Sequence, residues 1–148
     1  MWRELVSAVF PTPCPGCGRP ADPVCAGCAR TLRPPPFASP PEPVDGWVAA
    51  FAYEGVAREL VARVKYRQAR ATLPWLVAAV AGAVVRSHPP GSFDAVTWAP
   101  TTPERRRARG FDHGLLLARG VAGALGVPLE ASLGRRPGPP QTALSSAA

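Results

Sequence analysis

The chain has little lysine, and it lacks the long apolar segments of membrane-spanning and secreted proteins. Its longest apolar run, residues 73–85, has 13 residues and contains a proline, whereas a membrane-spanning helix needs about 20 residues. The apolar stretch near the N-terminus is shorter than the roughly 7–15 residues of a signal-peptide core. We therefore expect no membrane span and a cytoplasmic protein with reduced thiols.

Arginine takes the place of lysine. Of the seventeen basic residues sixteen are arginine, Lys65 is the single lysine, and the formal net charge is +7. The guanidinium group presents a rigid fork of donors that suits phosphate and carboxylate, although a biased codon usage would also enrich arginine. The 148 residues are 47% hydrophobic, enough for one small module and one modest packed domain.

The four cysteines are confined to one short window. They are spaced C-x2-C-x7-C-x2-C, and the glycines between them supply the backbone freedom of tight turns. Two such hooks predict a tetrahedral site of four thiolates, which is the preference of zinc. Because the site has no open position, we expect the zinc to be structural. The ligands are Cys14, Cys17, Cys25 and Cys28.

Two other readings of these cysteines stay open, a redox pair and disulfides. A redox C-x-x-C normally lies in a strand-to-helix turn of a larger fold. Here the hooks lie in a Pro/Gly-rich segment that has almost no apolar core of its own. Such a segment needs a metal or a cross-link in order to fold, so zinc is favoured and disulfides are the alternative.

Three segments follow one another along the chain. Residues 1–32 form the zinc-binding Cys module, residues 33–45 a proline-rich linker, and residues 46–148 an α/β domain. In that domain apolar runs predict strands, and apolar residues at helical spacing predict helices. The predicted strands are 46–53, 93–100 and 127–133, and the predicted helices are 54–67, 72–87 and 111–126.

Four arginines gather in residues 105–109, which we interpret as a loop between the strand 93–100 and the helix 111–126. Ligands of open α/β sheets bind at that edge, and the free N–H groups of the helix favour an anion. Gly110 would let the backbone turn closely into the helix. A solvated basic loop is the alternative interpretation.

The neighbours of this loop have simpler expected roles. Asp112 lies in the first turn of the helix and is expected to cap its N–H groups. We expect His113 to be a surface or capping residue and not a catalyst. Tyr53 and Tyr66 are expected to pack at the boundary of the core, and the position of Lys65 by itself indicates an exposed charge at a helix end.

The motifs together resemble the ComF family of phosphoribosyltransferase-like proteins, which includes GntX. Four segments correspond in order: the Cys hooks at 14–28, "AYEGVARELVARVKYR" at 52–67, "DAVTWAPTTPERRRARGFDHGLLLA" at 94–118, and "RRPGPPQTALSSAA" at 135–148. The pieces Lys-Tyr-Arg and R-x-R-G-F are the most specific of them. The sequence departs from the family at Asp112 and His113, where the family has Asn-Gln.

The resemblance implies a type I phosphoribosyltransferase-like domain that binds the pyrophosphate side of a phosphorylated small molecule. The implied phosphate-binding residues are Lys65, Arg105, Arg107, Arg109 and Gly110, with Mg²⁺ accompanying the ligand. Such proteins continue into a strand, two adjacent acids and a Thr-Thr-Gly loop, and the 148 residues contain no such segment. We therefore expect an incomplete domain that does not catalyse the transfer.

Two alternative functions remain at this point. The first is a nucleic-acid-associated zinc protein in DNA uptake, which would hold DNA phosphates through its arginines or assemble with competence-machinery proteins. Stacking on bases would then need Phe111 or Trp98 to be exposed. The second is an inactive fragment, whose unpaired sheet edge would be open to aggregation or to a partner.

Overall fold

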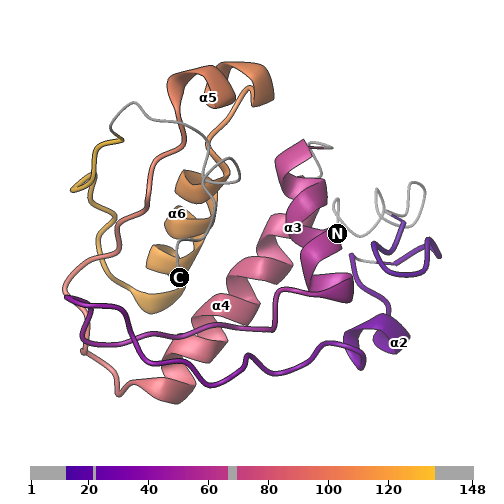
Figure 1. Cartoon of the computed structure of the whole chain (residues 1–148), viewed down its shortest axis with the longest axis horizontal. Coiled ribbons are helices and arrows are strands. Elements are labelled where there is room, and N and C mark those ends of the chain that lie inside the picture. The colour runs from indigo at the N-terminus through magenta and orange to yellow at the C-terminus, as the bar shows by residue number, and fades with distance from the viewer. Residues whose placement is uncertain (1–12, 22, 67–69, 136–148) are drawn as a thin grey trace, which may run out of the picture.

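The structure is a computed structural model that describes residues 13–21, 23–66 and 70–135 (Figure 1). In these ranges the chain is rich in helix and has little strand. The ends of the predicted Cys module and of the predicted α/β domain, residues 1–12 and 136–148, lie outside the described residues. The elements are α2 (Ala26–Ala29), α3 (Gly55–Tyr66), the 3₁₀ turn η1 (Arg70–Thr72), α4 (Leu73–Ser87), α5 (Pro103–Arg109) and α6 (His113–Leu125).

Helices α4 and α6 pack side by side and form the main packed pair (Figure 1). The helices approach closely at Gly120, where an added Cβ would overlap the side chain of Val77. Mostly small side chains are buried on both helices, which lets the backbones come together. They are Ala81 and Ala83 on α4, and Ala118, Val121 and Ala122 on α6.

Helix α3 buries one face and leaves the other to solvent. Ala57, Leu60 and Val64 recur at helical spacing and are buried, as the apolar pattern predicted. Glu59 and Arg63, four residues apart on this helix, form an ion pair with 3.6 Å between the carboxylate and the guanidinium group. The C-terminal end of α3 carries Lys65, so the packing of this helix decides where the single lysine lies.

The predicted α/β sheet is not formed by the described residues. Two of the three predicted strands, 93–100 and 127–133, do lie beside each other in parallel, but they share one isolated bridge between Val96 and Leu129. Two hydrogen bonds of 2.9 Å flank it, from Val96 N to Pro128 O and from Glu130 N to Val96 O. The segment 46–53 is not a strand, since none of its residues joins a ladder in the described chain.

The predicted arginine loop is largely a helix, α5. Thr102 is its N-cap and accepts from the N–H of Arg105, Pro103 takes the first position, and Gly110 ends it with φ of +76°. This is the usual chemistry of a helix start and stop. The loop prediction was wrong, because Pro103 is well suited to the first helical position and the arginines after it are good helix formers.

The predicted linker, 33–45, contains neither helix nor strand. In Figure 1 the segment starts near α2 and runs across the lower part of the molecule, where it crosses the lower half of α4 in this view. Its start contacts the chain again through a 3.1 Å hydrogen bond from Ala52 N to Arg33 O. Within the described ranges, every helix is too short or too polar to cross a bilayer.

Candidate functional site

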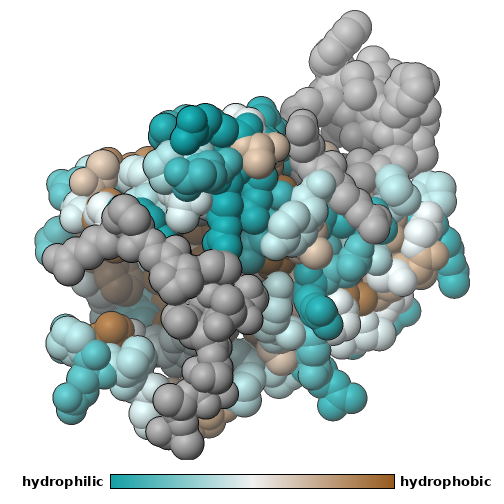
Figure 2. All heavy atoms as spheres, turned by 45° about the horizontal axis from the view of Figure 1, so that its top comes forward, coloured by the Kyte–Doolittle hydropathy of each residue, from teal (hydrophilic) through white to brown (hydrophobic). Residues whose placement is uncertain are grey.

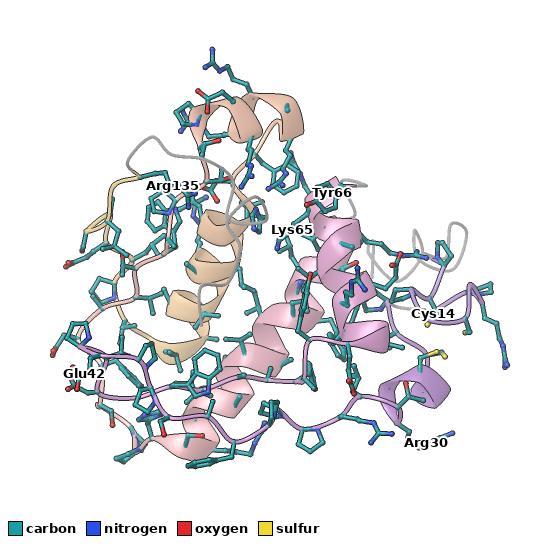
Figure 3. All side chains as sticks on the ribbon, in the orientation of Figure 1. Cys14, Arg30, Glu42, Lys65, Tyr66 and Arg135 are labelled. Atoms are coloured by element: carbon teal, nitrogen blue, oxygen red, sulfur yellow. The ribbon has the colours of Figure 1, made fainter. Side chains whose placement is uncertain are left out.

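The four cysteine sulfurs form one cluster beside α2 (Figure 3). All four lie within 4.8 Å of one another, and the separations from the sulfur of Cys25 are 3.7 Å to Cys14 and 3.6 Å to Cys17. Zn–S bonds of about 2.3 Å at tetrahedral angles place sulfurs about 3.8 Å apart. The cluster therefore has the dimensions of a tetrahedral thiolate site and can hold a metal ion such as zinc.

The same separations bear on the disulfide alternative. A disulfide bond is about 2.05 Å long, and the four cysteines are free thiols in the structure. The cysteines of the cluster also differ in exposure, since Cys14 is fully buried and Cys17 is exposed. The geometry thus fits four ligands around one ion better than two covalent pairs.

Each hook has its own local geometry. In the first, Cys14 N donates to Arg19 O at 2.7 Å and Gly18 N donates to Cys14 O at 2.9 Å, and Gly18 has φ of +74°. In the second, Cys25 is the N-cap of α2 and its sulfur accepts from the backbone N–H of Cys28 at 3.4 Å. Glycine supplies the left-handed conformation of the first turn.

Proton affinities are unequal within the cluster. Burial raises the pKa of Cys14, but N–H groups of Cys25, Cys17 and Gly16 stabilise its thiolate more, and the pKa falls to about 6. The neighbouring thiolates of Cys25 and Cys14 raise the pKa of Cys28 to about 12. The pKa of Cys14 thus lies below its usual range and that of Cys28 above it, so Cys14 gives up its proton more readily than Cys28.

The cysteine module is packed against α3. An added Cβ at Gly16 would lie 2.7 Å from the sulfur of Cys28 and 2.7 Å from Cγ2 of Val56 on α3. Arg63 of the same helix donates from Nη1 to Pro13 O at 3.0 Å. The cysteine module and helix α3 therefore lie against each other at Gly16 and Pro13.

A second candidate site is a cleft of about 890 Å³ between the ends of α3, α5 and α6. Figure 3 shows Lys65 and Tyr66 at the end of α3 and Arg135 on the opposite side, beneath α5. The surface over α5 is mainly hydrophilic (Figure 2). The polar side chains that line the cleft are Lys65, Tyr66, Thr101, Arg105, Arg109, His113 and Arg135. No carboxylate is among its described lining residues, so we call it the cationic cleft.

Helix α5 divides the arginine cluster between two hollows. Arg105 and Arg109, four residues apart and therefore on one face, line the cationic cleft. Arg107 and Gly110 instead line a second hollow of about 540 Å³, together with Arg106. Of the five predicted phosphate-binding residues, the structure thus brings together Lys65, Arg105 and Arg109, and places the other two elsewhere.

Arg107 also has a partner of its own. Its guanidinium group lies 3.7 Å from a carboxylate oxygen of Glu104, one turn earlier on α5. It also donates from Nε to Pro103 O at 3.4 Å. Arg107 is separated from Arg105 and Arg109 because every second residue lies on the same side of an extended chain, but not on the same side of a helix.

The N-terminus of α6 is already capped. The carboxylate of Asp112 accepts from the N–H groups of Gly114 at 2.9 Å, Leu115 at 3.3 Å and Thr101 at 3.0 Å. These bonds outweigh the effect of burial, so the pKa of Asp112 is lowered. The expected cap is confirmed, but the first N–H groups of this helix are occupied and are not free to bind an anion. We therefore expect side chains, and not the N-terminus of α6, to bind an anion in the cleft.

His113 and Tyr66 contact the arginine that lies between them. Nη1 of Arg109 is 3.4 Å from Nδ1 of His113, and its guanidinium carbon lies 5.1 Å from the centre of the Tyr66 ring. Burial, followed by the charges of Lys65 and Arg109, lowers the pKa of His113. Tyr66 is 73% exposed and Tyr53 is 64% exposed, so the expectation that these two tyrosines pack at the boundary of the core was wrong.

Aromatic stacking on bases has little support here. Phe111 is 8% exposed, and the guanidinium group of Arg70 lies 4.6 Å from the centre of its ring. Trp98 is partly buried and its Nε1 has no partner in the described chain. The condition that the nucleic-acid alternative placed on Phe111 is therefore not met.

Four polar lining residues of the cleft were not among the predicted phosphate-binding residues: Tyr66, Thr101, His113 and Arg135. The sequence did indicate one of them. His113 comes only four residues after Arg109, at the start of the next predicted helix, so it had to lie near the arginine cluster. Arg135 lies far along the chain from α5, and nothing local in the sequence indicates that it returns to the cleft. Comparisons with known proteins add no relative, since no family model, curated protein or solved structure matches the chain.

Proposed function

We propose that the chain is a ComF-like protein of the phosphoribosyltransferase family that binds a phosphorylated small molecule in the cationic cleft. The observation that carries the proposal is the convergence of Lys65, Arg105, Arg109 and Arg135 on one cleft without a lining carboxylate in the described chain. These are the residue types that bind phosphate through charge-assisted hydrogen bonds. The side chains come from separate elements, so their meeting is a property of the fold.

The pairing of charges elsewhere supports the same proposal. Acidic residues neutralise arginines outside the cleft: Glu54 pairs with Arg33, and Glu104 with Arg107. No described carboxylate pairs in this way with the four cations of the cleft. Like charges placed together without a counter-ion repel one another, and a bound polyanion would relieve that repulsion.

Zinc has a structural part in this proposal. The cluster of four thiolates leaves no ligand position for a substrate, and it packs on α3 through Gly16 and Val56. Because α3 carries Lys65 at its other end, an intact cluster helps to fix one wall of the cleft. Mg²⁺ would arrive with the phosphorylated ligand, as the family resemblance implies.

The proposed activity of the 148 residues is binding, without transfer. The sequence has no two adjacent acids and no Thr-Thr-Gly segment, the parts that the resemblance assigns to the sugar phosphate. A site that holds only the pyrophosphate end does not position the other reactant, and positioning supplies much of the rate of a two-substrate reaction. The family assignment and the ligand class rest on the sequence resemblance together with the cleft.

Calorimetric titration of the zinc-loaded protein with pyrophosphate and with phosphoribosyl pyrophosphate, each with and without Mg²⁺, tests the proposal. Arg105→Ala should weaken binding about 10- to 150-fold, since a hydrogen bond to a charged group contributes about 1.5–3 kcal/mol. Arg119→Ala removes an exposed arginine of α6 outside the cleft and is the control.

Arg107→Ala removes the same charge from the same helix as Arg105→Ala, but from the side that faces the second hollow. If it weakened binding as much as Arg105→Ala, net charge and not the cleft would hold the ligand. Absence of binding by the unsubstituted protein at low ionic strength would refute the proposed function.

A further inference from the structure

We propose that His113 takes up a proton when a phosphorylated anion binds in the cationic cleft, so that the protein holds this ligand more tightly as the pH falls. The inference rests on the proposed function and deepens it. It concerns a position at which the sequence departs from the family that it resembles. It gives His113 a part in the site, where the sequence indicated only a surface or capping residue.

The position of His113 makes it a member of the site. It is the first residue of α6, directly after the N-cap Asp112, and its side chain lines the cleft with Lys65 and Arg109. Nδ1 lies 3.4 Å from Nη1 of Arg109. Arginine can only donate hydrogen bonds, so Nδ1 is the acceptor, and the neutral ring carries its proton on Nε2.

The surroundings of His113 in the empty cleft oppose its protonation. Cations face the cleft from α3 (Lys65), from α5 (Arg105 and Arg109) and from the segment after α6 (Arg135). Tyr66, also on α3, contributes a phenol. Among the described residues, Asp112 is the one carboxylate that acts on the ring. Burial and the charges of Lys65 and Arg109 outweigh this carboxylate, and the pKa of His113 is lowered.

A bound phosphate group would reverse this balance. Its negative charge would lie among the same cations and cancel their repulsion of the imidazolium ring. A protonated ring offers two N–H donors, and the ligand oxygens can accept from them as they accept from arginine. His113 therefore titrates at a higher pH in the complex than in the free protein, and binding consumes protons in the interval between the two values.

The chain has two histidines, so the titration of His113 can be followed by NMR without assignment of the whole spectrum. His88 is the only other histidine, and it lies far along the chain from the cleft, with its ring 5.0 Å from that of Phe93. Proton NMR of the two imidazole rings can follow both titrations in the free protein and at saturating inorganic pyrophosphate. The pKa of His113 should rise on binding, while the ring resonances of His88 should not respond to pyrophosphate.

His113→Gln supplies the thermodynamic test. The ratio of the pyrophosphate affinity of the unsubstituted protein to that of this variant cancels the titration of the ligand itself. The ratio should grow by roughly threefold from about pH 8 to about pH 6 for a pKa rise of one unit. His88→Gln should leave the pH dependence as it is in the unsubstituted protein.

The outcomes separate the two proposals. If both proteins bind pyrophosphate but their affinity ratio does not change with pH, or if the NMR titration of His113 does not move, the proton-uptake inference is wrong and the proposed function stands. If the unsubstituted protein does not bind pyrophosphate at any pH, the proposed function fails and the inference fails with it. A ratio that rises toward low pH together with a shifted His113 titration supports both.

Discussion

Gly16 lies where the cysteine cluster meets helix α3, and Gly16→Ala should weaken the metal site. The added Cβ would be 2.7 Å from the sulfur of Cys28 and 2.7 Å from Cγ2 of Val56. Carbon–carbon contacts are optimal at about 3.5–4.0 Å, so both neighbours must move. The sulfur cannot move freely, because a four-thiolate site fixes the sulfur positions.

The expected size follows from the cost of overpacking, about 1–3 kcal/mol. The module has almost no apolar core, so its folding and its metal binding are coupled. The cost therefore appears as a loss of zinc affinity of roughly 5- to 150-fold. Gly27→Ala is the matched control, because its Cβ would meet the sulfur of Cys25 at 3.8 Å, an ordinary contact within α2.

Competition with a chromophoric chelator at neutral pH measures both affinities, and a thermal melt with and without excess zinc gives the stability. Gly16→Ala should lower the zinc affinity and the melting temperature together, and Gly27→Ala should lower neither. Equal zinc affinities for Gly16→Ala and the unsubstituted protein would refute the packing of the cluster against α3. A protein that binds no zinc at all would refute the metal site itself.

Two further predictions concern the pH dependence of metal binding by the cysteine cluster and the packing of α4 against α6. Because the pKa of Cys28 is raised to about 12, zinc binding must displace its proton. Zinc affinity should therefore fall at least tenfold for each unit by which the pH is lowered around neutrality. Chelator competition at several pH values measures this, and a pH-independent affinity would contradict it. Gly120→Ala should lower the free energy of unfolding by about 1–3 kcal/mol, because the new Cβ would overlap Val77. Gly123→Ala on the same helix is the control, since its new Cβ meets nothing within 4 Å. It should not destabilise the protein in a denaturant titration.

The sequence predicted the three longer helices well because each one carries its own apolar period and its own ends. The expected helix 72–87 is α4 (Leu73–Ser87), and the expected helix 111–126 is α6 (His113–Leu125). Both have long apolar faces, and α6 has Asp112 before it and Gly126 after it as caps. The cysteine cluster was equally predictable, since ligand spacing alone brings four thiols together.

The pairing of strands and the set of residues that line the cleft were harder to predict from the sequence. Strand pairing depends on partners far along the chain, and the pattern of one segment does not show whether a ladder forms; the single Val96–Leu129 bridge illustrates this. The arginine cluster was recognised, but its division was not, because the side of α5 on which each arginine lies follows from the helix that Thr102 and Gly110 delimit. Arg135 joins the cleft through tertiary folding alone.

Because Lys65 is the only lysine, its chemical labelling measures occupation of the cleft directly. Zinc-loaded protein would be acylated with an amine-reactive reagent at increasing pyrophosphate, and the rate at Lys65 would be read by mass spectrometry with the α-amino group as the internal reference. We predict that pyrophosphate slows labelling of Lys65 in a saturable manner and that Arg105→Ala shifts the protection to higher ligand concentration. Unchanged labelling of Lys65 at pyrophosphate concentrations that saturate the protein would contradict the claim that the cationic cleft is the anion site.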